Sequence, residues 1–573
     1  CSRFNIDENL NIYDKTHNVF MYENLEEELN FFYQSILEKT PRYPFVCIYG
    51  IGNALLIKNL AKHYKHLFVF ESEIELFILA LSTIDLSEEL KVYKVVLFDC
   101  VAKDLEIQIA MIFDQQSILE YLSLYEMFIS SHYYLKYYET SILSLNELCI
   151  KSASVAIRNA DITCFLPLLT HGQFLQNIPS MLESIPFQRI LSQRKNKFDN
   201  AIVVSAGPSL AKQLPLLKAC QDKAVIFCAD GALSMLEKEG IVPDYVTNLD
   251  FTDLAMKFFQ NKENKTSLNI LSCATHPNVA HSLKAENCMI VLRNKALYQR
   301  FNFNDFGYID TGTHVSHFSY TLALALGFKN IIMIGQDLAF DEEGNSHSKG
   351  FDFGEKFSGE ENIDKLKIPA YAGKGEVLTH TTWNDYRIKL EYLFACNDQK
   401  AKFYNATEGG ARINFTEELS FKECCEKLLT KEKPKFELPK SLTKNRSDKL
   451  LVKFKEKIQK DQENAKRFLD DALALKQILE NILSKDFILP LEFLEKVYQN
   501  IENFNHSLDE DEFIQDEVLR GAFAYRGKLI SDVLKLHIKD ETHFITAYIK
   551  AYHEWLLYFV EKLEQKYKSL SKV

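Results

Sequence analysis

Between residues 198 and 415, short and almost uniformly apolar segments alternate with amphipathic helical stretches, and this alternation constrains the fold more than any other feature. The segment "NAIVV" at residues 200–204 is one example, and "SAGPSL" follows it at once. Strands that are apolar on both faces are typical of a parallel sheet covered by helices on both sides. We therefore predict an α/β fold whose central Rossmann-like parallel-sheet domain spans residues 196–415.

The same alternation occurs on a smaller scale in residues 43–100. It predicts a smaller Rossmann-like α/β domain in residues 1–150, followed by a helical connector that reaches about residue 195. Gly50-Ile51-Gly52 follows the first strand and Glu71 ends the next, a pattern that resembles a dinucleotide-binding fingerprint. Leu55 occupies the third glycine position, so two interpretations stay open: a working ligand site, or a degenerate domain kept for its architecture.

The C-terminal part of the sequence has a helical pattern. Pro434 and Pro439 mark an extended linker, and apolar residues recur at spacings of three and four amid Lys and Glu through residues 445–573. An antiparallel helical bundle is the simplest account, and we assign residues 416–573 to a C-terminal helical domain. Most of its charges are expected to face solvent, with partner binding as the alternative.

Charge and cysteine usage narrow the class of protein. The formal net charge of −12 argues against nucleic acid as the main partner. The 12 cysteines form no paired metal-binding motif, which is typical of reduced thiols in the cytoplasm. We see neither a signal peptide nor an apolar run long enough for an integral membrane segment, so we expect a cytoplasmic protein.

The residues after each apolar strand are the candidate ligand contacts, because ligands of parallel sheets bind at the carboxyl ends of the strands. In "SAGPSL" the small residues allow close approach to the backbone, and Pro208 begins a helix whose free amides can hold an anion. A plain tight turn with Ser209 as a helix cap is the alternative. Gly312 and Thr313 precede a second helix, and two such anion sites favour a nucleotide sugar. The predicted donor-binding residues are Gly207, Pro208, Ser209, Asp230, Gly231, Asn248, Asp250, Gly312, Thr313 and Gln336.

Several segments together resemble a known family. "VVSAGPSL", "FCADGAL", "PDYVTNLD", "GQDLAF" with "GNSHS", and "NATEGGARI" are similar to the Maf (motility accessory factor) flagellin glycosyltransferases of the MptE-like superfamily. The same core is similar to bacterial CMP-sialic acid sialyltransferases, although Ala206 stands where those enzymes carry an amide side chain.

The resemblance implies a glycosyltransferase that moves a nonulosonic acid, pseudaminic or legionaminic acid, from a CMP-activated donor to Ser or Thr of flagellin and so supports flagellar assembly and motility. The implied partners are the nucleotide sugar and flagellin, the latter held by the C-terminal helical domain. We expect no tightly bound cofactor and no metal site, and we leave a need for a divalent metal open. Asp230 and Asp250 are expected to orient sugar or ribose hydroxyls.

Four residues are candidates for the catalytic steps. His380 lies before an amphipathic helix, where the resemblance to sialyltransferases implies the catalytic histidine, and His347 follows the strand that bears Gln336 and Asp337. Asp337 itself and Glu408, which precedes a pair of glycines, complete the set. His314 and His317 with Asp310 could suggest a metal site, but no third ligand has the expected spacing, and a polar helix surface is preferred.

Two other classes of function remain open at this point. A pterin diphosphokinase would need ATP and Mg²⁺, with Asp230, Asp250 and Asp253 holding the ion. A non-catalytic adaptor would bind flagellin through residues 445–573 and keep the sheet as a relic.

Overall fold

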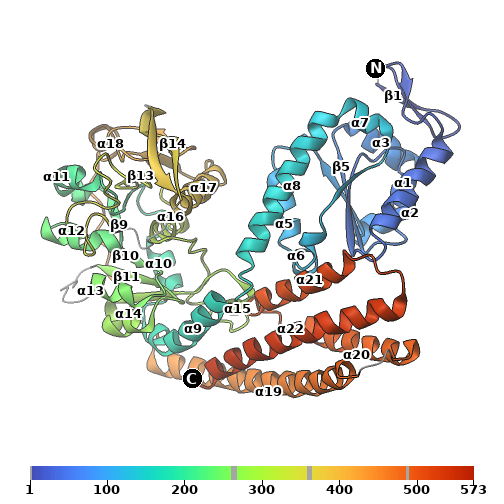
Figure 1. The fold of residues 1–573 in the computed structure, drawn as a ribbon. Coiled ribbons are helices and arrows are strands. Elements are labelled where there is room, and N and C mark those ends of the chain that lie inside the picture. The colour runs from blue at the N-terminus through green and yellow to red at the C-terminus, as the bar shows by residue number, and fades with distance from the viewer. Residues whose placement is uncertain (1–2, 260–266, 358–363, 374, 486–488, 573) are drawn as a thin grey trace. The chain divides into compact units, whose positions relative to one another are not determined.

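The computed structural model describes residues 3–259, 267–357, 364–373, 375–485 and 489–572. The chain forms two compact units, each described here by itself. The N-terminal unit consists of Cys1–Leu168 with Asn464–Tyr567, and the central unit consists of Leu169–Glu463 with Lys568–Val573. Figure 1 labels many of the elements of both. The domain boundaries expected from the sequence stay predictions.

The central unit is built on an eight-stranded sheet in the order β12-β11-β10-β9-β8-β13-β16-β17, and every neighbouring pair is parallel. The predicted α/β class with a central parallel sheet is thereby confirmed. The strands are β8 (Asn200–Val204), β9 (Val225–Ala229), β10 (Tyr245–Asn248), β11 (Leu268–Ser272), β12 (Cys288–Val291), β13 (Asn330–Ile334), β16 (Lys402–Asn405) and β17 (Glu417–Glu418).

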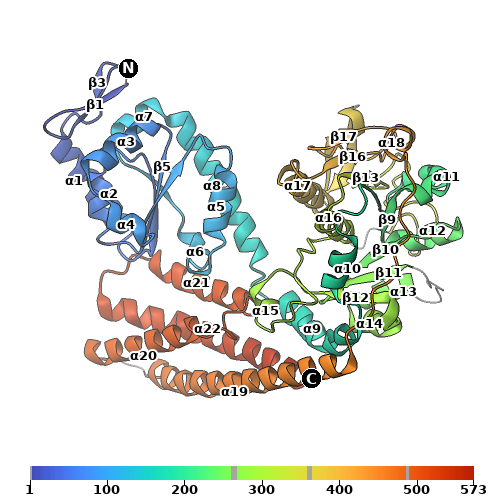
Figure 2. The same cartoon turned by 180° about the vertical axis from the view of Figure 1, so that it is seen from behind.

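Both faces of this sheet are buried, as the apolar strands require. Successive strand residues such as Ile202 and Val203 belong to separate core clusters, because neighbouring side chains of a strand point to opposite faces. The helices α10 (Phe187–Arg194), α16 (Val315–Ala325) and α17 (Thr381–Ala395) cover one face. The other face is covered by α11 (Leu210–Cys220), α12 (Leu233–Lys238) and α18 (Phe421–Leu428), as Figure 2 shows from behind.

The strand order reverses at β8, and this reversal fixes where a ligand can bind. From β8 the chain builds outward through β9 to β12 on one side and then returns to place β13 on the other side. The connections after β8 and β13 therefore leave in opposite directions, and a crevice opens between the carboxyl ends of these two strands. The remaining elements of the unit are α9 (Phe165–Glu183), which begins in the N-terminal unit, α13 (Met256–Phe259), α14 (Pro277–Ser282), α15 (Ala296–Gln299) and the hairpin of β14 (Lys365–Pro369) and β15 (Glu376–His380).

The N-terminal unit repeats this plan with a four-stranded parallel sheet in the order β6-β5-β4-β7. Its strands are β4 (Phe45–Tyr49), β5 (His66–Glu71), β6 (Val95–Asp99) and β7 (Met127–Ile129), so its own reversal lies between β4 and β7. A three-stranded antiparallel sheet precedes it, made of β1 (Phe4–Ile6), β2 (Ile12–Asp14) and β3 (Val19–Phe20). The helices are α1 (Leu25–Lys39), α2 (Leu55–Leu60), α3 (Ile74–Thr83), α4 (Ser87–Lys91), α5 (Leu105–Phe113), α6 (Gln116–Leu119), α7 (His132–Tyr137) and α8 (Glu139–Asn159).

Four long helices end the chain: α19 (Lys444–Leu483), α20 (Leu491–Asp509), α21 (Arg520–Leu534) and α22 (Glu541–Leu570). Trp555 is fully buried among them, and its indole N–H donates to the carbonyl of Ala522 at 2.8 Å. Within the ranges that the structure describes, no helix has both the length and the apolar character needed to cross a membrane.

Candidate functional site

A pocket of about 280 Å³ opens at the reversal of the central sheet, between the carboxyl ends of β8 and β13. Residues after four strands and at the starts of two helices line it, which agrees with the place expected for ligands of such a sheet. The lining residues are Ser205, Ala206, Gly207, Ala229, Asp230, Gly231, Asp250, Phe258, His314, Val315, Ser316, Gly335, Gln336, Asp337, Leu338, Ser346, His347, Phe351, Trp383 and Tyr386.

The turn before α11, the expected phosphate cradle, has its amides occupied by other parts of the chain. The N–H of Gly207 donates to the carbonyl of Gly335 at 2.8 Å, and the N–H of Ala211 donates to the hydroxyl of Ser348 at 3.0 Å. Ser209 donates its N–H at 3.3 Å and its hydroxyl at 2.8 Å to the carboxylate of Asp337. The start of α11 therefore already binds an anion, the carboxylate of Asp337 in the loop after β13.

Asp337 is enclosed on several sides. A Cβ on Gly207 would overlap Oδ2 of Asp337 and lie 2.6 Å from the carbonyl oxygen of Gly335, so the turn requires glycine for internal packing. Gly410 has φ +71, and a Cβ there would overlap the backbone of Asp337. Burial raises the pKa of Asp337 to about 6, although the bonds from Ser209 lower it.

The helix α16 presents a different N-terminus to the pocket. His314 is its N-cap, and Nδ1 of the ring accepts the N–H of His317 at 3.3 Å. The hydroxyl of Ser316 lies 2.8 Å from the same nitrogen. The N–H groups of Val315 and Ser316, at the first two helical positions, have no acceptor among the residues that the structure describes. Both residues line the pocket, so the positive end of this helix faces it.

The bonds of His314 fix its tautomer. Because Nδ1 accepts an amide N–H, the neutral ring carries its proton on Nε2, and this nitrogen has no partner among the described residues. Burial lowers the pKa of His314 well below its usual value, with His317 and Lys389 adding to the effect. The ring stacks on Tyr386 with 4.6 Å between centroids. His314 therefore offers a neutral N–H donor beside the two free amides of α16.

Sequence reasoning did not identify His314 as a pocket donor and considered it only as part of a metal site or a polar helix surface. The signal that points to it is its place directly before the first turn of a helix that begins after a small-residue segment. Gly312 and Thr313, which were predicted to hold the ligand, are not among the lining residues. Gly312 has φ +63 and packs against the ring of His317, and Thr313 is exposed.

The structure separates the two candidate catalytic histidines. His347 lines the pocket, and its ring stacks on Phe351 with 4.0 Å between centroids and 7° between planes. Burial lowers the pKa of His347 to about 4, so the ring is neutral at pH 7. His380 is buried at the N-cap of α17, and its ring centroid lies 4.1 Å from that of Trp383. Trp383 lines the pocket and His380 does not.

Two further polar residues of the pocket, Asp230 and Gln336, each accept hydrogen bonds from two neighbouring groups. Asp230 accepts the N–H of Gly231 at 2.7 Å and the side-chain amide of Asn248, which orients the carboxylate from behind. Gln336 accepts the hydroxyls of Ser205 at 2.9 Å and Tyr320 at 3.2 Å. The predicted residues Gly207, Asp230, Gly231, Asp250, Gln336, Asp337 and His347 all line one pocket.

Other predicted residues lie elsewhere. Pro208, Ser209 and Asn248 stand next to lining residues without lining the pocket themselves. Glu408 has φ +57, and its carboxylate accepts the N–H of Phe421 at 3.0 Å, so it caps the start of α18. Asp253, considered for a Mg²⁺ site, is exposed and lies 3.6 Å from the ring of His276. Within the described ranges, no group of three or more His, Cys, Asp or Glu residues is placed to hold a metal ion.

In the N-terminal unit the glycine turn is occupied by the chain's own side chains. The N–H of Ile51 donates to Glu71 at 3.0 Å, and the N–H of Gly52 donates to the hydroxyl of Tyr134 at 3.1 Å. That hydroxyl in turn donates to Glu71 at 2.6 Å, and a Cβ on Gly50 would overlap the ring of Tyr134. These contacts favour the interpretation of a domain kept for its architecture.

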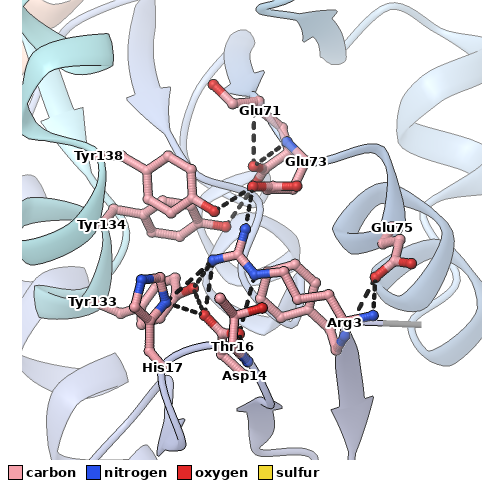
Figure 3. A network of polar contacts seen from close by, with 12 residues as sticks. Arg3, Asp14, Thr16, His17, Glu71, Glu73, Glu75, Tyr133, Tyr134 and Tyr138 are labelled. Atoms are coloured by element: carbon pink, nitrogen blue, oxygen red, sulfur yellow. Dashed lines mark hydrogen bonds and ion pairs between the residues drawn. The ribbon is translucent and has the colours of Figure 1, made fainter. Parts of the chain in front are cut away.

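A polar network lies beside this turn, as Figure 3 shows. The guanidinium of Arg3 binds both carboxylate oxygens of Asp14 at 3.0 and 2.8 Å and Glu73 at 2.6 Å. The hydroxyls of Tyr133 and Tyr138 donate to Asp14 and Glu73, each at 2.6 Å. The segment that carries β1 and β2 is thereby bound to the same edge of the small sheet.

Fold and pocket define an α/β protein with a ligand site at the reversal of a parallel sheet. Residues 172–343 match the sequence profile of the family described as 6-hydroxymethylpterin diphosphokinase MptE-like. The structure of the Maf glycosyltransferase from Magnetospirillum magneticum AMB-1 is similar over 100% of this chain and 95% of that chain, with a TM-score of 0.56 and 14% identity. A search of curated proteins returned no match. The resemblance to Maf and MptE-like proteins predicted from the sequence is thereby confirmed, and the fold is that of the Maf structure.

Proposed function

We propose that this chain is a glycosyltransferase that moves pseudaminic or legionaminic acid from a CMP-activated donor to Ser or Thr of flagellin, in the cytoplasm. The observation that carries the proposal is the donor set at the start of α16, which has no acceptor among the described residues and faces the pocket at the reversal of the sheet. The fold shared with a protein described as a glycosyltransferase supports the reaction class. The substrate and the acceptor come from the sequence resemblance.

The α16 N-terminus suits the phosphate of a CMP-sugar. Nε2–H of His314 and the N–H groups of Val315 and Ser316 are three donors beside a helix dipole whose positive end faces the pocket. Because burial lowers the pKa of His314, its ring is neutral at pH 7. The neutral ring already carries the Nε2–H and can donate it to a phosphate without being protonated first. Asp230 and Asp250, which line the same pocket, can accept hydroxyls of the ribose or the sugar.

The transfer step follows from this placement. The acceptor hydroxyl attacks the anomeric carbon, a new carbon–oxygen bond forms, and the bond to the phosphate oxygen breaks with its electron pair leaving on CMP. The donors at α16 stabilise the charge that grows on the leaving phosphate. The acceptor proton passes to His347, which is neutral at pH 7 and lines the pocket. Asp337 holds the α11 turn through Ser209 and acts as a positioning residue.

The test is transfer by the purified full chain, measured as the mass increase of flagellin incubated with CMP-pseudaminic or CMP-legionaminic acid. His347→Ala should lower the transfer rate by about a hundredfold, as expected for loss of a general base. His281→Ala is the matched control, because this histidine lies on the exposed side of α14 outside the pocket. Normal transfer by His347→Ala would refute the assignment of the base to His347, and normal transfer by His380→Ala as well would exclude both candidate histidines.

The second candidate is a pterin diphosphokinase, which the description of the matching family favours. Ligand preference separates the two functions. Under the transferase proposal CMP raises the melting temperature of the full chain and ATP with Mg²⁺ does not. The opposite preference, together with AMP formation from ATP and 6-hydroxymethylpterin, would support the kinase instead.

Flagellin binding completes the proposal. We assign it to the C-terminal helices, as expected from the sequence, and cross-linking of flagellin to the full chain followed by peptide mapping tests it. Cross-links in α19 to α22 are expected, whereas cross-links confined to residues 169–443 would overturn this assignment.

A further inference from the structure

A second pocket, of about 480 Å³, lies entirely within the N-terminal unit, where α20 and α22 meet the loop before β4. Its walls carry the aromatic rings of Tyr121, Tyr498, Phe544 and Tyr548. Three carboxylates line it as well, those of Glu495, Glu502 and Glu541. Arg42 is the cation among the described residues that line it. The pocket combines aromatic faces with an excess of negative charge, and the proposed transferase chemistry uses none of it.

The chain itself shows how these walls hold a cation. The guanidinium of Arg42 lies over the ring of Phe544, 4.1 Å from its centroid. The same group donates to Glu541 at 2.6 Å and to the carbonyl of Ile538 at 2.9 Å. A guanidinium in this pocket is therefore bound by one aromatic face and one carboxylate at once.

The same pocket contains a second group of carboxylates and tyrosine rings, and no cation of the described residues pairs with these carboxylates. Oε1 of Glu502 accepts the hydroxyl of Tyr548 at 3.2 Å and the side-chain amide of Asn505 at 3.4 Å, while Oε2 has no partner among the described residues. Glu495 likewise has no ion pair within the described part of the chain. The rings of Tyr498 and Tyr548 lie 4.9 Å apart at 58°, which leaves their faces at an angle. Burial and the neighbouring Glu502 and Glu541 raise the pKa of Tyr498 to about 12.

We propose that this pocket binds an arginine or lysine side chain of a protein partner. The carboxylates of Glu502, which is half-buried, and Glu495, which is exposed, supply the negative charge that pairs with such a cation. The tyrosine faces stabilise the same cation, and the apolar residues Ile530, Leu534 and Ile545 suit the alkyl part of a long basic side chain. The proposal is independent of the transferase function.

The test uses the full chain and three probes, observed by ligand saturation-transfer NMR. The first probe is the blocked peptide acetyl-Gly-Arg-Gly-amide, the second has citrulline in place of Arg, and the third is spermidine. Citrulline keeps the shape and removes the charge, so the Arg peptide should bind about fivefold more tightly or better. Equal binding of the two peptides would overturn the proposal, as would tighter binding of spermidine than of the Arg peptide.

Variants of the pocket provide the second arm. Glu502→Gln keeps an acceptor for Tyr548 and should weaken the Arg peptide by about tenfold. Tyr498→Leu should weaken it by about fivefold. The control is Glu492→Gln, since this carboxylate lies on the same helix, pairs with Lys496 and does not line the pocket. Each variant is first shown to have the melting profile of the natural chain. Unchanged affinity in both pocket variants would contradict the assignment.

Discussion

Both parallel sheets of this protein contain a strand, a glycine-containing turn and a helix in succession, but the space above the turn is filled in one sheet and open in the other. In each, a carboxylate at the end of a neighbouring strand binds amides of the glycine turn: Glu71 binds Ile51, and Asp337 binds Ser209. In the N-terminal unit Tyr134 then fills the space above the turn. In the central unit a pocket remains. A glycine turn after a strand is therefore insufficient evidence for a phosphate site, because the neighbouring loops decide what occupies it.

A helix beside each reversal explains the difference, α7 directly after β7 and α16 directly before β13. After β7, α7 carries Tyr133 and Tyr134, whose hydroxyls bond to the carboxylates at the sheet edge. At the start of α16, the side chains of His314 and Ser316 hydrogen-bond, among the described residues, to each other and to their own helix. Long aromatic side chains close one crevice, and short or locally bonded ones leave the other open.

The largest effect is expected from Gly207→Ala. The added methyl group would overlap the carboxylate of Asp337 and lie 2.6 Å from the carbonyl oxygen of Gly335. We expect the free energy of unfolding to fall by about 3 kcal/mol or more. Gly172→Ala is the control, because a Cβ there comes no closer than 3.8 Å to another residue and alanine favours a helix. Urea unfolding of both variants measures the difference, and equal stability would show that Asp337 does not enclose the turn.

The Asp337→Asn variant tests, through the pH dependence of stability, whether Asp337 is enclosed at the turn of the central sheet. The folded pKa of about 6 exceeds that of an unfolded aspartate, so the folded state binds more protons between about pH 4 and pH 6 and loses stability as pH rises through that window. The loss amounts to about 3 kcal/mol at most for this group. The Asn variant should lack this contribution. Urea unfolding from pH 4 to pH 7 gives the difference between the two chains, and parallel curves would refute the raised pKa.

Tyr134→Phe tests the occupied crevice. The change leaves the N–H of Gly52 and one oxygen of Glu71 without their shared partner, which should cost about 1–3 kcal/mol of stability. Because the small crevice holds no ligand in this account, CMP affinity should stay as in the natural chain. Thermal melting with and without CMP measures both quantities, and a selective loss of ligand binding would show that the N-terminal sheet takes part in the site.

The sequence predicted the fold class and the edge of the sheet at which the pocket lies. Both follow from local patterns, since apolar strands and the small residues after them mark strand ends directly. The occupant of the SAGPSL turn could not be predicted, because Asp337 lies 128 residues away and reaches Ser209 only through the pairing of β8 with β13. The same holds for Glu408, whose carboxylate caps a helix that starts 13 residues later.

His314 shows the other limit of sequence reasoning. Its role depends on which ring nitrogen accepts the amide of His317, and this is set by the first turn of α16. The spacing of the two histidines predicts neither that tautomer nor the free Nε2. The candidate bases differ for a similar reason, because Trp383 lines the pocket in front of His380, whereas His347 lines it directly.

The most direct test of the account is the affinity of CMP for the His314→Asn variant. Asparagine is a good N-cap, so it can accept the N–H of His317 and preserve α16, but it lacks the Nε2–H donor. The account predicts an unchanged melting temperature and a dissociation constant about tenfold higher, which corresponds to loss of about 1.4 kcal/mol. A dissociation constant equal to that of the natural chain would contradict the claim that the anion of the ligand binds at the start of α16.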